Sequence, residues 1–296
     1  MNLDKIDLVN GFMPWISERI KGQPEVLAAL NEHLACSELG LTDPLYVKGG
    51  FMFVGPTGVG KTEVTLCLTD YFADGNLCKM NMSEFKTTES IMELRARLTK
   101  AHMGQCRVFL LDEIEKAHWE AMDLLLGILD KGAELTAADG RLINFTDSYF
   151  VMTSNLGAKE AMRSRTNNYT SFKNTVLQYV TLAMRPEIIG RLSKLGGIHV
   201  FRRLGEPEQR ALAGFHIKRV LERMARHGCH LELSESAFEY IVRNGYSAEY
   251  GARNMEGVIM KAIQEAVSTA ARVRQQVSGR LIENPDSNGL TIVQVA

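Results

Sequence analysis

The stretch from Gly55 to Thr62 constrains the fold more than any other part of the sequence. It reads Gly-Pro-Thr-Gly-Val-Gly-Lys-Thr, which fits the phosphate-binding loop pattern G-x-x-x-x-G-K-[ST]. The apolar run Phe51 to Val54 before it is typical of a buried strand, and Glu63 to Leu68 after it begins like a helix. Glycines let the backbone close around a phosphate, and the unpaired N–H groups at a helix N-terminus point at it. A chance match to a glycine-rich loop is the alternative, and the flanking strand and helix argue against it.

The loop predicts a site for ATP and Mg²⁺. Lys61 is expected to reach the β- and γ-phosphates, and the Thr62 hydroxyl is expected to hold Mg²⁺. The predicted nucleotide-binding residues of the loop and the first helical turn are Gly55, Pro56, Thr57, Gly58, Val59, Gly60, Lys61, Thr62 and Glu63.

A second motif follows another apolar run. Val108 to Leu111 reads as a central parallel strand buried on both faces, and Asp112 and Glu113 come directly after it. A carboxylate at the end of such a strand lies beside a phosphate loop and can order Mg²⁺, so Asp112 is the expected metal carboxylate. Glu113 is the expected catalytic base, which polarises the attacking water. The alternative is a solvated acidic cap of a helix.

Composition excludes several other classes of protein. The 296 residues carry a formal net charge of -1, so no overall basic field attracts nucleic acid or a membrane surface. The five cysteines show no C-x-x-C spacing, which argues against a zinc site and for a reducing compartment. Neither a signal peptide nor a membrane-spanning apolar segment is evident, so we expect a cytoplasmic protein.

The order of the expected elements divides the chain into two domains. Strands alternate with helices over residues 1–203, which predicts an α/β domain with a doubly wound parallel sheet. From residue 204 the pattern becomes mainly helical, so residues 204–296 are expected to form a smaller helical lid domain. Residues 159–176 are polar with weak periodicity and are expected to form an exposed loop.

Several motifs together resemble a known family. Beside the phosphate loop, they are Met82 to Phe85 (MSEF), Leu110 to His118 (LLDEIEKAH), Val151 to Gly157 (VMTSNLG) and Tyr250 to Arg253 (YGAR). In this order they resemble the Clp-type branch of the AAA+ ATPases, in particular the second ATPase ring of disaggregase-type Clp proteins. The resemblance covers nearly the whole chain from Gly22 and implies a P-loop NTPase core followed by a helical lid.

The resemblance also implies roles for residues outside the two motifs. Asn155 matches the sensor-1 position, which places the attacking water, and Arg191 matches the arginine finger, which reaches the γ-phosphate of a neighbouring subunit. Arg253 matches the sensor-2 arginine, which reads the γ-phosphate and couples the lid to it. Ile20 and Lys21 match the segment that lines the adenine pocket. The catalytic set expected from all of this is Lys61, Glu113, Asn155, Arg191 and Arg253.

The chain departs from the family where an aromatic pore loop is usual. The segments around Ile91 and Leu98 resemble the flanks of that loop, but only Arg95-Ala96-Arg97 lies between them, without the aromatic pair. Gly190 stands where asparagine is usual before the finger arginine, and Asn254 replaces a usual proline after Arg253. We therefore expect a protein that does not thread polypeptide processively.

These patterns leave three hypotheses for function. The first is a Clp-type ATPase that assembles into a ring, as a hexamer, and remodels a specific protein partner. The second is an ATP-dependent scaffold or assembly factor of a larger machine, which the missing pore loop favours. The third is an AAA+ protein that acts on nucleic acid. Net charge gives this hypothesis no support, and only Arg95 and Arg97 favour it.

Overall fold

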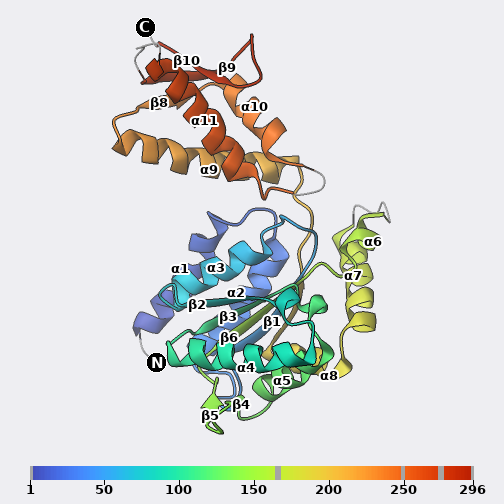
Figure 1. Ribbon diagram of the computed structural model, residues 1–296. Coiled ribbons are helices and arrows are strands. Elements are labelled where there is room, and N and C mark those ends of the chain that lie inside the picture. The colour runs from blue at the N-terminus through green and yellow to red at the C-terminus, as the bar shows by residue number, and fades with distance from the viewer. Residues whose placement is uncertain (1–2, 164–167, 248–250, 273–276, 295–296) are drawn as a thin grey trace. The chain divides into compact units, whose positions relative to one another are not determined.

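A parallel sheet organises the first two-thirds of the chain (Figure 1). The structure is a computed structural model that describes residues 3–163, 168–247, 251–272 and 277–294. Across the sheet, the strands found in these residues are β2 (Leu77–Asn81), β3 (Val108–Asp112), β6 (Tyr149–Ser154), β1 (Gly49–Val54) and β7 (Gly196–Val200). Every neighbouring pair is parallel, and β1 and β6 are buried along their whole length. This confirms the predicted α/β fold with a parallel sheet.

Helices cover both faces of this sheet (Figure 1). Side chains alternate between the two faces along β1, and both faces carry apolar side chains that helices can bury. Met52 and Val54 pack into a core with one group of helices, whereas the rings of Phe51 and Phe53 lie on the other face. The first group comprises α4 (Thr88–Met103), α5 (Trp119–Leu129), α7 (Tyr169–Ala183) and α8 (Pro186–Leu195). The other helices and short elements before α8 are α1 (Leu3–Ser17), α2 (Pro24–Glu38), α3 (Lys61–Phe72), α6 (Ala158–Arg163), the 3₁₀ turns η1 (Met82–Glu84) and η2 (Ile114–Lys116), and the hairpin β4 (Glu134–Thr136) and β5 (Leu142–Asn144).

The chain divides into two compact units. Residues 1–56 and 60–202 form the first unit, and residues 203–296 form the second together with the three loop residues 57–59. The second unit contains α9 (Glu206–Arg226), α10 (Glu235–Gly245) and α11 (Met255–Arg272), with the sheet β10 (Leu290–Val293), β9 (Gly279–Glu283) and β8 (Leu231–Leu233). Ser234 caps α10 by accepting the N–H of Ala237.

One expectation from the sequence is wrong. Residues 159–176, which were expected to form a loop, are mostly helical where the structure describes them, because α6 occupies 158–163 and α7 begins at Tyr169. Residues 164–167 lie outside the described residues. The Asn168 side chain caps α7 by accepting the N–H of Thr170 at 2.8 Å. Val176 and Val180 are buried and lie about one helical turn apart. Partly buried Phe172 and Leu177 pack against the same core as these valines, so α7 has an apolar face. This face continues past residue 176, so the segment 159–176 contains only part of it and shows weak apolar periodicity.

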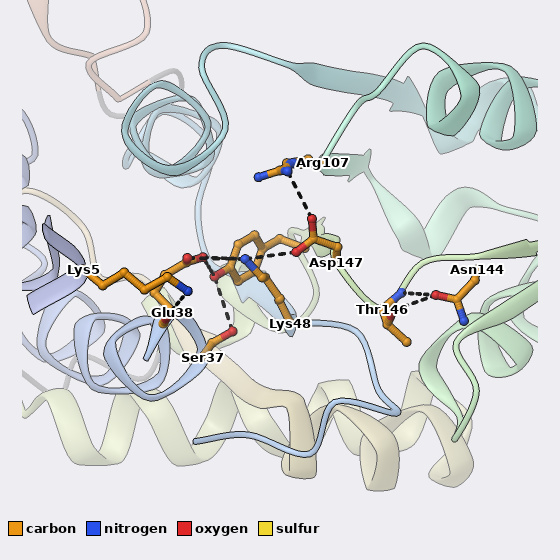
Figure 2. Close-up of polar contacts among 9 residues, drawn as sticks. Lys5, Ser37, Glu38, Lys48, Arg107, Asn144, Thr146 and Asp147 are labelled. Atoms are coloured by element: carbon orange, nitrogen blue, oxygen red, sulfur yellow. Dashed lines mark hydrogen bonds and ion pairs between the residues drawn. The ribbon is translucent and has the colours of Figure 1, made fainter. Parts of the chain in front are cut away.

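A polar network fixes the edge of the sheet opposite the loop motif (Figure 2). The Glu38 carboxylate is buried and accepts the Tyr149 hydroxyl at 2.5 Å and the Lys48 ammonium at 3.2 Å. Lys48 also pairs with Asp147 at 3.1 Å, and Asp147 pairs with Arg107 at 3.2 Å. Burial raises the pKa of the Tyr149 hydroxyl well above its usual range, and the Glu38 charge raises it further. The network joins the end of α2 to the starts of β1 and β6.

Tyr149→Phe is expected to lower the free energy of unfolding by about 1–3 kcal/mol, because it removes a donor from a buried carboxylate. Chemical denaturation followed by circular dichroism measures this difference. Tyr179→Phe is the matched control, because Tyr179 is 40% exposed on α7, and it should change the value by less than about 0.5 kcal/mol. Equal effects of the two substitutions would show that the buried hydroxyl does not stabilise this edge.

Candidate nucleotide-binding site

The parallel register brings the sequence motifs to one edge of the sheet. Val54 of β1 lies opposite Ser154 of β6, and Leu111 of β3 lies opposite Met152 of β6. The residues that directly follow these positions are Gly55, Asp112 and Asn155, so all three lie at the carboxyl edge. Ligands of open α/β sheets bind at this edge.

Two glycines of the loop have conformations or contacts that other residues would not tolerate. A Cβ at Gly55 would lie 2.4 Å from the carbonyl oxygen of Phe201, so the close approach of these two backbones requires glycine. Gly60 has φ of 104° and precedes the first residue of α3, a backbone conformation that L side chains rarely adopt. The loop therefore ends at a helix N-terminus, where backbone N–H groups are available to an anion.

The Lys61 ammonium lies at the centre of this edge. It donates to the carbonyl oxygens of Gly55 and Pro56, the latter at 2.8 Å, and to the side-chain oxygen of Asn155 at 2.9 Å. The structure thus brings together two residues that the sequence places 94 positions apart. Thr62 follows Lys61 in the first turn of α3 and is partly buried.

Asp112 is held at the end of β3 by two partners. The Thr153 hydroxyl of β6 donates to its carboxylate, and Lys79 of β2 lies 3.3 Å from its second oxygen. Thr153 also accepts the backbone N–H of Glu113 at 3.1 Å. One hydroxyl therefore fixes both the carboxylate of Asp112 and the backbone of the next residue.

Glu113 begins a turn with an unusual backbone. Its φ and ψ of 59° and 51° are left-handed, and its carboxylate accepts the Lys116 ammonium at 2.8 Å. This hydrogen bond is the main cause that raises the pKa of Lys116. The Glu113 side chain is 30% exposed, so water can reach the group expected to act as a base.

Asn155 is oriented by a residue to which the sequence analysis gave no role. The backbone N–H of Asn155 donates to Glu115 at 3.1 Å, while its side chain faces Lys61. The second carboxylate oxygen of Glu115 is buried and has no partner among the described residues. Glu115, Thr153 and Lys79 are site residues that sequence reasoning missed. Two of them lie inside the quoted motifs LLDEIEKAH and VMTSNLG, which is the signal that could have found them.

The remaining predicted residues of the first unit make other contacts. Arg191 is on α8, where its guanidinium donates to Asp130 at 2.7 Å. Ile20 is buried, and the Lys21 ammonium donates to the carbonyl oxygen of Ser17. Next to them, buried Gln23 exchanges two hydrogen bonds with the backbone of Arg202, at 2.8 and 3.0 Å. The segment around Ile20 is thus tied to the chain that follows β7.

Arg253 belongs to the second unit. It is exposed in the turn before α11, next to partly buried Ala252 and one residue before exposed Asn254. The exposed guanidinium leaves this residue accessible to an anion.

The donor set fits Mg²⁺ bound together with a nucleotide. Among the described residues no group of three or more His, Cys, Asp or Glu side chains could hold a metal ion by itself. Mg²⁺ usually takes one or two carboxylates and completes its shell with substrate phosphates and water. Asp112 and the Thr62 hydroxyl provide that kind of partial shell beside a loop suited to phosphate.

The matches to protein families change between residues 195 and 204, and the division of the chain into two compact units also falls there. Residues 47–195 match the family described as "AAA domain (Cdc48 subfamily)". Residues 204–281 match the family described as "C-terminal, D2-small domain, of ClpB protein". The first match includes the loop, Asp112, Glu113, Asn155 and Arg191, and the second includes Arg253.

Individual relatives agree with these matches. The "Chaperone protein ClpB" of Vibrio vulnificus (strain CMCP6) is 33% identical over 273 residues, covering 86% of this chain and 31% of the relative. The "Chaperone protein ClpB" of Gloeobacter violaceus is 34% identical over 274 residues, or 87% and 31%. The "ATP-dependent Clp protease ATP-binding subunit ClpC" of Staphylococcus saprophyticus is 30% identical over 292 residues, or 90% and 35%. The chain spans about a third of the length of these relatives.

Proposed function

The chain belongs to the AAA domain family (Cdc48 subfamily), an ATPase family, and we propose from this that it binds ATP with Mg²⁺ in the loop after β1 and hydrolyses it. The observation that carries the proposal is the convergence on Lys61. Its ammonium contacts the loop backbone and Asn155, and it shares the carboxyl edge of the sheet with Asp112 and Glu113. These are the groups that phosphoryl transfer to water needs.

Each side chain has a separate task in this proposal. Lys61 and the N–H groups at the start of α3 bind the phosphates, and Thr62 and Asp112 hold Mg²⁺, which neutralises phosphate charge. Glu113 accepts the proton of the attacking water. Asn155, fixed through Glu115, orients that water toward the γ-phosphate. Ile20 and Lys21 contribute to the adenine pocket.

We propose that the site is completed by a second copy of the chain. Clp-type members of the family generally assemble into rings, and here Arg191 lies on α8, where its guanidinium pairs with Asp130. Arg191 would then supply positive charge to the γ-phosphate bound by the neighbouring subunit, in a ring of six. Arg253 would read the γ-phosphate bound by its own chain and couple the second unit to it.

We further propose a cytoplasmic location, because the five cysteines lack the spacing of a disulfide framework. Cell fractionation tests it. Among the described residues, no helix is long and apolar enough to cross a membrane.

The mechanical output is remodelling of a specific protein partner. Helix α4 continues without a break through the three residues that stand at the pore-loop position. Arg97 is bonded to Glu84 and Glu93, and Arg95 donates to the carbonyl oxygen of Thr136 at 2.6 Å. Because both arginines are engaged within the chain, this segment favours neither a projecting loop nor a nucleic-acid contact. The same helix supports the second candidate, a nucleotide-dependent scaffold with little hydrolysis.

The chain is expected not to unfold a generic substrate, because gripping any polypeptide requires a projecting loop with large apolar contacts. A stably folded fluorescent reporter with a disordered tail, incubated with ATP and a trap for unfolded chains, measures this. Its fluorescence should persist at the level seen with Glu113→Gln. ATP-dependent loss of the signal without an adaptor would contradict the expectation.

Lys61→Ala is expected to weaken ATP binding at least about 100-fold, since it removes the ammonium that contacts the β- and γ-phosphates. Titration of a fluorescent ATP analogue measures the dissociation constant. Lys86→Ala, in an exposed lysine outside the loop, should leave it unchanged. Unchanged affinity in Lys61→Ala would place the nucleotide elsewhere.

Arg253→Ala should retain ATP binding but abolish any difference between ATP and ADP in the hydrogen exchange of α10 and α11.

A further inference from the structure

Two arginine–aspartate pairs connect α5 to α8. Asp123 on α5 accepts Arg185, which caps α8, and Asp130, which follows the last residue of α5, accepts Arg191. The two aspartates are seven residues apart, which is about two helical turns. Both have side chains that are 48% exposed, and their arginines are 37% and 32% exposed. The pairs are therefore closely matched in type and environment.

The two guanidiniums differ in their other contacts, because Arg185 also pairs with Glu187 through its Nε at 3.7 Å. The Nε of Arg191 is buried and has no hydrogen-bond partner among the described residues. Asp130 engages the outer part through Nη2 alone. Asp130 is itself fixed, because its other carboxylate oxygen accepts the N–H of Lys131 at 2.9 Å and its carbonyl oxygen accepts the N–H of Ala133 at 3.0 Å.

We propose that Asp130 is a positioning residue that orients Arg191 for the phosphate bound by a neighbouring subunit. The inference rests on the proposed function, in which Arg191 completes that site. An arginine has many rotamers, and a fixed carboxylate on one amino group selects a few of them before the phosphate arrives. The second amino group, Nη1, makes no hydrogen bond or ion pair with the residues that the structure describes, so it can donate to an acceptor on another chain.

The same pair could act in the opposite sense, as a latch that withholds Arg191. The geometry favours positioning, because a latch that sequesters a guanidinium would occupy both arms of its fork. A contact through one arm constrains direction and leaves the other arm for phosphate. The two senses predict opposite changes in rate when Asp130 is replaced.

The test measures steady-state ATP hydrolysis and ATP affinity in Asp130→Ala, with Asp123→Ala as the matched control. Asp130→Ala is expected to lower kcat roughly 10- to 100-fold, the effect of a displaced catalytic group, with ATP affinity unchanged. Asp130→Asn keeps an acceptor oxygen, so its kcat should lie between those of Asp130→Ala and the wild type. Asp123→Ala should retain wild-type kcat, because exposed pairs of this kind contribute little to stability.

Subunit mixing then separates positioning from a general defect. Asp130→Ala chains keep an intact site of their own, so adding Lys61→Ala chains, which have an intact Arg191, should restore hydrolysis. Adding Arg191→Ala chains should restore none. A rise in kcat, or wild-type kcat, in Asp130→Ala would overturn the inference while leaving the proposed function intact. Absence of hydrolysis in the wild type would contradict the proposed function itself and the inference with it.

Discussion

Glu113→Gln is expected to bind ATP with wild-type affinity and to hydrolyse it about 10²–10⁴ times more slowly. The substitution preserves the size of the side chain but replaces the carboxylate, which can accept a proton from water, with an amide, which cannot. The left-handed backbone at Glu113 and its N–H bond to Thr153 do not depend on the carboxylate, so the local fold should survive. Phosphate release and equilibrium binding of an ATP analogue measure the two quantities separately.

Glu120→Gln is the matched control for this substitution. Glu120 is a partly buried glutamate in the first turn of α5 that takes no part in the proposed site. The substitution Glu120→Gln should leave both the hydrolysis rate and the ATP affinity within about twofold of the wild type, because it changes no group of the proposed site. If Glu113→Gln still hydrolysed ATP at the wild-type rate, the base would be another residue.

Arg191→Ala is expected to lower kcat by about 10³–10⁵-fold, the range found when an arginine finger is supplied in trans. ATP affinity should change little, because the loop and Lys61 of the same chain bind the phosphates. Arg191→Lys should recover only part of the rate, since lysine lacks the planar guanidinium, which can pair with Asp130 through one amino group and donate to phosphate through the other. Hydrolysis assays at saturating ATP measure the difference.

The trans assignment has its own test in mixed assemblies. Lys61→Ala chains lack a working site, and Arg191→Ala chains lack a working finger, so each is expected to be inactive alone. A mixture contains some interfaces with an intact site from one chain and an intact arginine from the other, and it should regain part of the activity. No recovery in verified mixed assemblies would place the action of Arg191 within its own chain.

The parts of the fold that follow from local pattern were predictable. Val108 to Leu111 is apolar throughout, and such a run is typical of a strand buried on both faces. The match of Gly55 to Thr62 fixed the place of the loop, because few other loops combine these glycines with a lysine. The order of strand, loop and helix then predicted the carboxyl edge where Asp112 lies.

The remainder depends on contacts between distant residues. The bond from Lys61 to Asn155 and the link from Thr153 to Asp112 arise from strand order across the sheet, which periodicity alone does not determine. The helix α7 is not evident within residues 159–176 because its apolar face continues past that segment, to Leu177 and Val180. Asp130 follows α5 as an ordinary acidic residue in the sequence, and only packing against α8 shows its pairing with Arg191.

The central claim, an ATPase whose site is completed by a neighbouring subunit, is tested most directly by hydrolysis as a function of protein concentration. Wild-type protein at saturating ATP and Mg²⁺ should show a rate per chain that rises with concentration and reaches a plateau as assemblies form. The Glu113→Gln chain should stay at background throughout. Full activity per chain in a verified monomer, or no activity above Glu113→Gln at any concentration, would contradict the claim.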